Sequence, residues 1–202
     1  MRLLLASDLH RNLDAARDLV RRSAGVDVVV IAGDLCSVRR GLGEIIGVLM
    51  TIETPSVVVP GNAESDEELR QACRAWPAAH ALHGNGCEIG GAAFFGLGGG
   101  VPVTPFGDWS FDLAERNAAG LLAACPEGAV LVTHSPPKGH CDADSGGPSL
   151  GSSAILECIE RTHPRLVVCG HIHAAWGQRS TLGPTTIINA GPKGFEIDLD
   201  AM

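Results

Sequence analysis

The stretch Val28-Val29-Val30-Ile31-Ala32-Gly33-Asp34 decides the fold. Its first five residues form an uninterrupted apolar run, and four of them are β-branched. A run of this length and composition is typical of a strand that is buried on both faces. The run ends at a glycine and an acid, so the sequence predicts a buried strand whose carboxyl end leads into a polar loop.

The same arrangement occurs four more times along the chain. The runs and their polar endings are Leu3–Ala6 before Ser7-Asp8-Leu9-His10, Val57–Pro60 before Gly61-Asn62, Val130–Thr133 before His134, and Leu166–Cys169 before Gly170-His171-Ile172-His173. Helical patterns are expected at 12–24, 39–51, 66–75, 110–124 and 152–162, where Ser65 and Glu68 make a capping box before the third. Alternation of strands and helices predicts an α/β fold.

Two further regions interrupt this rhythm with short β segments. Residues 87–89 and 92–95 flank Gly90-Gly91, which predicts a hairpin with a two-residue turn. The end of the chain predicts strands near 174–178, 185–189 and 194–199. We place these segments in a second sheet, so the expected architecture is a two-sheet β-sandwich core flanked by helices. The length of 202 residues favours a single domain over 1–202.

Composition narrows the class of protein. Hydrophobic residues make up 45% of the chain against 19% charged residues, which excludes a disordered chain. The net charge of −8 disfavours nucleic acid and anionic membranes as partners. No apolar run reaches the length of a membrane span, and residues 1–10 do not resemble a signal peptide. Seven scattered cysteines without a C-x-x-C pair favour reduced thiols and a cytoplasmic location.

The five polar endings together offer metal-binding side chains. In open α/β sheets, ligands bind outside the carboxyl ends of the strands, and all five endings fall there. The side chains are Asp8, His10, Asp34, Asn62, His134, His171 and His173. Carboxylate, amide and imidazole ligands without thiolate suit Mn, Fe, Co, Ni or Zn. Seven ligands exceed the needs of one four-coordinate ion and suit two ions that share a carboxylate, an arrangement used to hydrolyse phosphate esters.

These motifs, D-x-H, G-D, G-N, H and G-H-x-H in this order, resemble the calcineurin-like metallophosphoesterase superfamily. The segments 133–139 and 189–192 are similar to its small prokaryotic phosphoesterase branch. The resemblance implies a four-layer α/β/β/α fold and two metal sites. Asp8, His10, Asp34 and His173 would hold the first ion, and Asp34, Asn62, His134 and His171 the second, with Asp34 bridging. It also implies that a bridging hydroxide attacks phosphorus directly.

One position departs from the family pattern. The third motif of the family usually contains G-N-H followed by an acid, whereas this chain has Gly61-Asn62-Ala63-Glu64. The histidine that would protonate the leaving group is therefore replaced by Ala63, and general acid catalysis contributes about 10²–10⁴-fold. We expect a preference for good leaving groups, or an acid from elsewhere. Glu64 and His140 are the candidate catalytic residues.

Two loops are expected to border the site. The Gly- and Pro-rich segment 96–109 is typical of a binding loop, in which Phe106 and Trp109 either stack on an aromatic group of the substrate or cap the core. The loop 135–151 follows a predicted ligand. Its Lys138 either binds substrate phosphate or is simply solvated.

The sequence therefore predicts a metal-dependent phosphoric ester hydrolase. Its expected partner is a small phosphorylated substrate, favoured as a phosphodiester or an activated ester such as a cyclic nucleotide. The alternative is a weak or inactive metal-binding scaffold on the same fold, because some relatives with this fold have lost catalysis. The net charge of −8 disfavours a nuclease. The sequence leaves open whether the protein forms a homo-oligomer.

Overall fold

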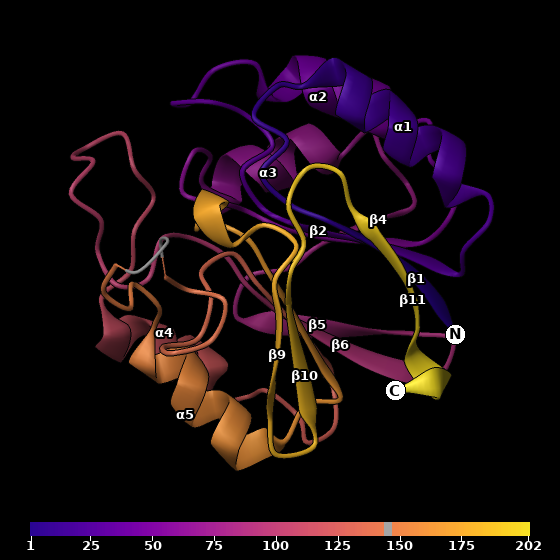
Figure 1. The fold of residues 1–202 in the computed structure, drawn as a ribbon. Coiled ribbons are helices and arrows are strands. Elements are labelled where there is room, and N and C mark those ends of the chain that lie inside the picture. The colour runs from indigo at the N-terminus through magenta and orange to yellow at the C-terminus, as the bar shows by residue number, and fades with distance from the viewer. Residues whose placement is uncertain (144–146) are drawn as a thin grey trace.

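Three apolar runs in the first half of the chain form neighbouring parallel strands. The computed structural model describes residues 1–143 and 147–202. The first sheet has the order β11-β1-β2-β3-β4 (Figure 1). Its parallel strands are β1 (Arg2–Ala6), β2 (Val28–Ala32), β3 (Ser56–Val59) and β4 (Ala79–Ala81), and β11 (Phe195–Asp198) pairs antiparallel with β1 at the edge. Register pairs Leu5 with Val30 and Ile31 with Val58.

The remaining strands make a second sheet with the order β5-β6-β7-β8-β10-β9. They are β5 (Asn85–Ile89), β6 (Ala92–Leu97), β7 (Val130–Thr133), β8 (Leu166–Cys169), β9 (Arg179–Leu182) and β10 (Thr185–Asn189). Strands β6, β7, β8 and β10 are parallel, while β5 and β9 form antiparallel hairpins at the two edges. The carboxyl ends of β7 and β8 therefore lie at one end of this sheet.

The alternation of side chains within each run explains why the runs are apolar throughout. Leu3, Val28 and Val30 point between the sheets, where they pack with Phe94 and Val132 of the second sheet. The intervening residues of the first sheet pack under α1 (Leu13–Ser23), α2 (Leu42–Leu49) and α3 (Asp66–Cys73). Those of the second sheet pack under α4 (Glu115–Leu122) and α5 (Ser153–Thr162). The result is the expected α/β/β/α layering, with helices outside both sheets (Figure 1).

Most expected elements are present, and the differences have local causes. Helix α3 begins with the expected capping box, in which Ser65 and Glu68 bond each other's backbone N–H groups. Helix α2 starts at Leu42 rather than 39, because the preceding turn has positive φ angles at Val38 (48°) and Arg39 (61°). Helix α4 begins at Glu115 rather than 110, since the preceding residues hydrogen-bond to the loop at Gly100 and to Asn62. Strand β4 was not expected.

The end of the chain differs most from expectation. The segment 174–178 is not a strand, because His173–Ala175 forms a 3-10 turn and β9 starts only at Arg179. Strand β11 matches the expected 194–199 segment but joins the first sheet, where it covers the open edge of β1. A short 3-10 turn, Leu199–Ala201, follows it. No helix in the described part of the chain is long and apolar enough to cross a bilayer.

Candidate metal centre

The carboxyl ends of five strands from both sheets converge on one place. Asp8 and His10 follow β1, Asp34 follows β2, and Asn62 follows β3. His134 follows β7, and His171 and His173 follow β8. Two groups of these side chains have ligand atoms within 4.8 Å of one another. They are Asp8, His10 and His173, and Asp8, Asp34 and His134, so each group draws on both sheets.

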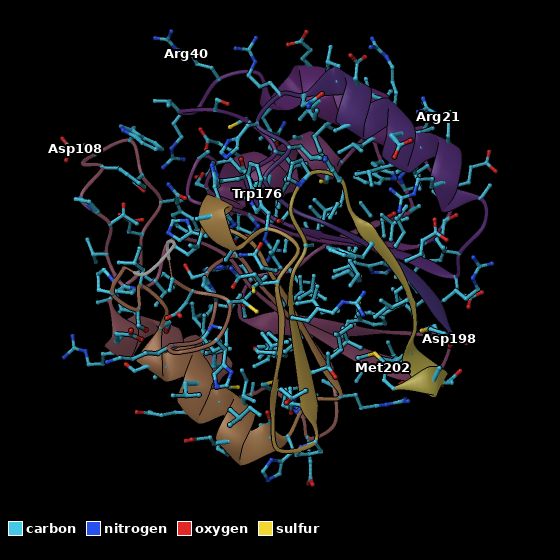
Figure 2. The ribbon with its side chains drawn as sticks, in the orientation of Figure 1. Arg21, Arg40, Asp108, Trp176, Asp198 and Met202 are labelled. Carbon is cyan, nitrogen blue, oxygen red and sulfur yellow. The ribbon has the colours of Figure 1, made fainter. Side chains whose placement is uncertain are left out.

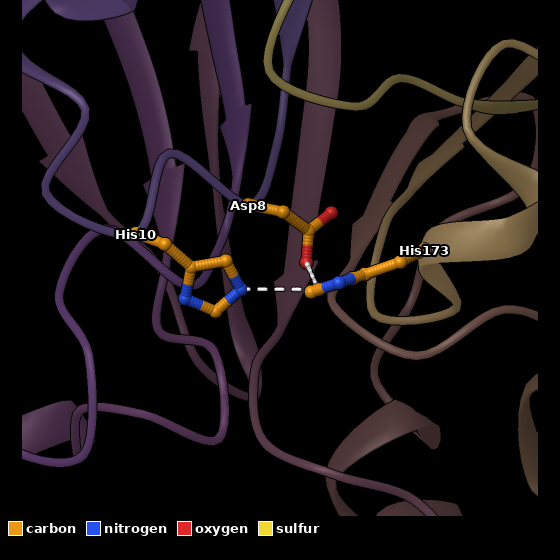
Figure 3. Close-up of side chains that lie close together, drawn as sticks. All are labelled: Asp8, His10 and His173. Carbon is orange, nitrogen blue, oxygen red and sulfur yellow. Dashed lines mark hydrogen bonds and ion pairs between the residues drawn. The ribbon is translucent and has the colours of Figure 1, made fainter.

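The first group brings two imidazole rings and a carboxylate to one point (Figure 3). The Nε2 atoms of His10 and His173 are 3.1 Å apart, and the Nε2 atom of His173 lies 3.8 Å from Oδ1 of Asp8. The two rings meet edge to face with centroids 5.0 Å apart. Two ring nitrogens at this distance share either a proton or a cation, and the neighbouring carboxylate favours positive charge between them.

The carboxylate of Asp34 lies between the imidazole rings of His10 and His134. Its Oδ2 atom is 3.4 Å from Nε2 of His10, and its Oδ1 atom is 3.4 Å from Nε2 of His134. The amide oxygen of Asn62 lies 3.2 Å from the same His134 nitrogen. The rings of His134 and His171 meet edge to face, with centroids 4.9 Å apart. One carboxylate thus presents an oxygen to each side, which is the geometry that a bridging ligand requires.

Two of the histidines are held in the tautomer that a metal ligand needs. The Nδ1 atom of His10 lies 3.1 Å from the carbonyl oxygen of Cys36, and that of His134 lies 2.9 Å from the carbonyl oxygen of Ala32. Because a carbonyl only accepts, Nδ1–H is the donor in both rings. The Nε2 lone pairs then face the acids, so the donors of this cluster suit a divalent metal ion.

Asp8 is fixed by three donors, and one of them comes from Trp176, a residue that the sequence analysis did not single out. Its carboxylate accepts hydrogen bonds from Ser7 Oγ at 2.5 Å, from the His171 N–H at 3.0 Å, and from Trp176 Nε1 at 3.1 Å. The Trp176 ring also lies over His173, with centroids 4.3 Å apart. Figure 2 shows Trp176 beside the 3-10 turn that carries His173. Trp176 lies in a segment expected to be a strand, so its spacing gave no signal.

Burial and neighbouring charges shift the pKa values of His171 and His134 in opposite directions. Burial, together with the neighbouring His134, lowers the pKa of His171 to about 3. Burial also opposes the charged form of His134, but Asp34 and Asp8 outweigh this effect and raise its pKa. Carboxylates packed against a buried imidazole thus favour positive charge at this point, which suits a cation.

The backbone at the strand ends is strained. Asp8, His10, Asp34 and His171 have φ angles of 55°, 42°, 53° and 67°, in the left-handed region that side chains rarely adopt. Gly61 permits this packing, because a Cβ atom there would collide with the backbone nitrogen and Oδ1 of Asp34. Such strain persists where the surrounding structure enforces it, and it is concentrated at functional sites.

A cavity of about 700 Å³ opens beside the cluster. His10, Asp34, Asn62, His171 and His173 form its floor. Ala63 also lines it, at the position where the family pattern has histidine. Its other walls are the 37–38 turn, the 102–109 loop and Leu150, so both loops expected to border the site do so. Residues 144–146 of the second loop lie outside the described residues.

The candidate substrate residues fall into two sets. Phe106 and Trp109 line the cavity and stack on each other with ring centroids 5.5 Å apart, so they do not cap the core. Lys138 is exposed and is not among the residues that line it. His140 is not among them either, and its Nδ1 atom lies 3.2 Å from Ser180 Oγ.

Glu64 is not among the residues that line the cavity. Its side chain is fully buried, and its oxygens accept hydrogen bonds from the N–H groups of Leu35, Cys36 and Gly61 at 3.2, 3.1 and 2.8 Å. These contacts join the loop after β2 to the loop after β3. Glu64 therefore holds the segments that carry Asp34 and Asn62 in place.

Comparisons with known proteins agree with this architecture. A UPF0046 protein of Caenorhabditis elegans, K07C11.7, is 35% identical over 123 residues, which are 57% of this chain and 39% of that protein. The match therefore spans well under two thirds of this relative. The solved structure of TT1561 from Thermus thermophilus has a TM-score of 0.80 at 19% identity and covers 99% of this chain and 95% of that one. A dimetal phosphatase from Danio rerio has a TM-score of 0.64 at 14% identity, with 95% and 87% covered. These two likenesses show the fold.

The family comparison spans nearly the whole chain. A sequence profile of the calcineurin-like phosphoesterase superfamily domain matches residues 1–199, which include every strand end described above. The chain belongs to the calcineurin-like phosphoesterase superfamily, a family of metal-dependent phosphoesterases.

Proposed function

We propose that this protein is a two-metal phosphoesterase that acts on phosphodiesters. The observation that carries the proposal is the position of Asp34, which turns one oxygen toward His10 and the other toward His134. Asp8, His10, Asp34 and His173 would hold one ion, and Asp34, Asn62, His134 and His171 the other. The zebrafish neighbour is itself described as a dimetal phosphatase, which supports the same reading.

The metal pair, when bound, would supply Lewis-acid charge for the phosphate oxygens and an activated water. The residues of the chain do the remaining work. His10 and His134 keep their protons on Nδ1 through backbone carbonyls. Ser7, Trp176 and the His171 N–H hold the Asp8 carboxylate in one orientation. This rigidity fixes the positions of the ligands before substrate arrives.

Two features narrow the class of ester, and the first of them favours diesters over monoesters. A phosphodiester carries one negative charge and a monoester up to two, and the described residues that line the cavity include no lysine or arginine for the extra charge. Ala63 offers no proton to a leaving group, so esters of acidic alcohols, whose leaving groups need no protonation, are preferred. A small phosphorylated molecule is therefore the proposed partner. The seven cysteines are free, which supports a reducing compartment such as the cytoplasm.

The test compares bis(p-nitrophenyl) phosphate with p-nitrophenyl phosphate on protein reconstituted with Mn, Fe, Co, Ni or Zn. We expect the diester to be the better substrate and Asp34→Asn to lose both turnover and bound metal. The matched control is Asp14→Asn on the exposed face of α1, which keeps both.

Each alternative result has a definite meaning. Full turnover in Asp34→Asn would overturn the bridging role. A faster monoester would overturn the diester preference and would require a proton donor elsewhere. Two bound ions per chain without turnover on either ester would favour a scaffold role.

A further inference from the structure

The cavity beside the metal centre has an exposed apolar rim. Among the described residues, seven large apolar side chains are exposed, and four of them line this one cavity. They are Val38, Val103, Phe106 and Leu150, with exposed fractions of 49, 62, 50 and 47%. They come from three separate segments of the chain, so their meeting at one opening is a feature of the fold. Figure 2 marks the projecting loop of Val103 and Phe106 by its residue Asp108. A concave site lined mainly by apolar side chains, with a few polar groups at its floor, is typical of a ligand pocket.

The backbone conformation that places Val38 at this rim is strained. Val38 is β-branched, yet its φ angle is 48°, where β-branched residues are genuine outliers. The turn around it is closed by reciprocal backbone hydrogen bonds between Ser37 and Arg40. The Arg39 N–H also bonds to the carbonyl oxygen of Ala63, which ties the turn to the cavity floor. Strain that places an apolar side chain beside a reactive centre is an independent indication that the side chain meets a ligand.

Three polar side chains around the rim are already engaged with other residues of the chain. Arg39 directs its guanidinium to Glu68 and to the carbonyl oxygen of Trp109, so its charge is neutralised away from the cavity. Thr104 Oγ1 donates to Asp112 at 2.7 Å, and Asn62 Nδ2 donates to Ser110 at 3.0 Å. These groups are therefore not free to recognise the edges of a nucleobase.

The two aromatic side chains complete the wall. Phe106 and Trp109 stack with ring planes 16° apart, so each ring covers one face of the other. The pair presents an apolar surface that is already ordered, and it has no open slot between its rings for a base.

From these observations, and resting on the proposed function, we propose that the substrate is a phosphodiester with an apolar alkyl or aryl ester group that lies along Val38, Val103, Phe106 and Leu150. The phosphate itself lies at the metal centre. The oxygen of water bonds to phosphorus, the P–O bond to the leaving group breaks, and the leaving oxygen takes up a proton. The products are a phosphomonoester that keeps the apolar group and an alcohol or phenol.

The test uses p-nitrophenyl phosphodiesters whose second ester group is methyl, butyl, phenyl or thymidine 5′-yl. Leaving group and charge are the same in all four, so differences in kcat/KM report the second group. Each methylene removed from water favours binding by about fourfold. With three extra methylenes partly buried, we expect butyl to exceed methyl by about tenfold, with phenyl similar and thymidine no better than methyl.

Two variants test whether the preference for the butyl ester arises at the apolar rim. The double variant Val103→Ser and Phe106→Ser should bring the butyl-to-methyl ratio close to one. Met50→Ser removes an exposed apolar side chain at the C-terminal end of α2, which is not among the residues that line the cavity, and should leave the ratio unchanged. Equal rates for methyl and butyl in the wild-type protein would overturn the inference and leave the proposed function standing. A thymidine ester faster than butyl would replace it with nucleoside recognition. No hydrolysis of any of the four esters would refute the proposed function itself.

Binding provides a readout that does not depend on turnover. Dimethyl and dibutyl phosphate have alkoxide leaving groups and should be poor substrates, so calorimetric titration can compare them on the metal-loaded protein. We expect dibutyl phosphate to bind more tightly and with a more negative heat-capacity change, the signature of apolar burial. Equal heat-capacity changes for the two would contradict the apolar site.

Discussion

Glu64 offers the sharpest test of how the site is held together. Replacement by alanine removes the acceptor of three backbone N–H groups, those of Leu35, Cys36 and Gly61, in a fully buried position. Each buried donor left without a partner costs at least about 1 kcal/mol, so Glu64→Ala should lower the free energy of unfolding by about 3 kcal/mol. Burial and the nearby Asp34 raise the pKa of Glu64, so the loss of a disfavoured charge offsets part of the cost.

Glutamine is the matched comparison. Oε1 of Glu64 accepts from both Leu35 and Gly61, and a glutamine oxygen can keep these two bonds. Only the bond from Cys36 to Oε2 is lost, so Glu64→Gln should cost about 1 kcal/mol. Urea unfolding measures both variants. With a slope near 2 kcal/mol/M, the midpoint should fall by about 1.5 M for alanine and about 0.5 M for glutamine.

The same pair of variants separates positioning from catalysis. If Glu64 donated a proton to the leaving group, Glu64→Gln would fold normally and lose about 10²–10⁴-fold on alkyl esters alone. We expect instead that glutamine keeps the ratio of alkyl to p-nitrophenyl ester rates, while alanine weakens metal binding and lowers stability together. Wild-type stability in Glu64→Ala, or a selective loss on alkyl esters in Glu64→Gln, would refute the reasoning.

Three further outcomes follow from the site. Ala63→His should raise the rate on alkyl esters by about 10²-fold and change p-nitrophenyl esters little, and an unchanged alkyl rate would contradict this. Trp176→Phe keeps a ring over His173 but removes the N–H that binds Asp8, so competition with a chelator should show metal affinity reduced by about tenfold. The pKa of His171 is lowered to about 3 in the folded protein, against about 6.5 unfolded, so the unfolded chain binds the proton first. In the metal-free protein, the contribution of His171 should therefore reduce stability as pH falls from 6.5 toward 3, while the raised pKa of His134 acts in the opposite direction. The change in urea midpoint from pH 7.5 to pH 5 should be less negative in His171→Asn, where only the first contribution is removed.

The pattern of apolar runs was sufficient to predict the layers of the fold, because every residue of a strand that is covered on both faces has to be apolar. Val28 to Ala32 is apolar throughout, since one face packs against the second sheet and the other against helices. The same pattern does not predict which of the two sheets each strand joins. β11 has the same alternation whether it pairs with β10 or β1, and only the register with Leu3 and Leu5 places it in the first sheet.

The ligand cluster was predictable because strand ends of parallel sheets meet at one edge. The contacts that surround the cluster could not be predicted from the sequence. Whether Glu64 faces the cavity or the backbone depends on how the loops after β2 and β3 approach each other, and Gly61 sets that approach. Trp176 reaches Asp8 only because residues after His173 turn instead of extending, a choice that short-range propensity does not determine.

Both candidate ligand groups combine residues before β5 with residues after β6, and so neither half of the chain holds a complete set. Bound ions would therefore connect the two sheets across the interface between them (the seam), because their ligands come from both sheets. Loss of metal and separation of the sheets become linked events, since opening the seam moves His134 and His173 away from Asp8. Amide hydrogens of the central strands β2 and β7 would exchange more slowly as metal concentration rises, and metal release into chelator would be slow for the same reason. The rate of metal loss would then be limited by the rate at which the two sheets separate.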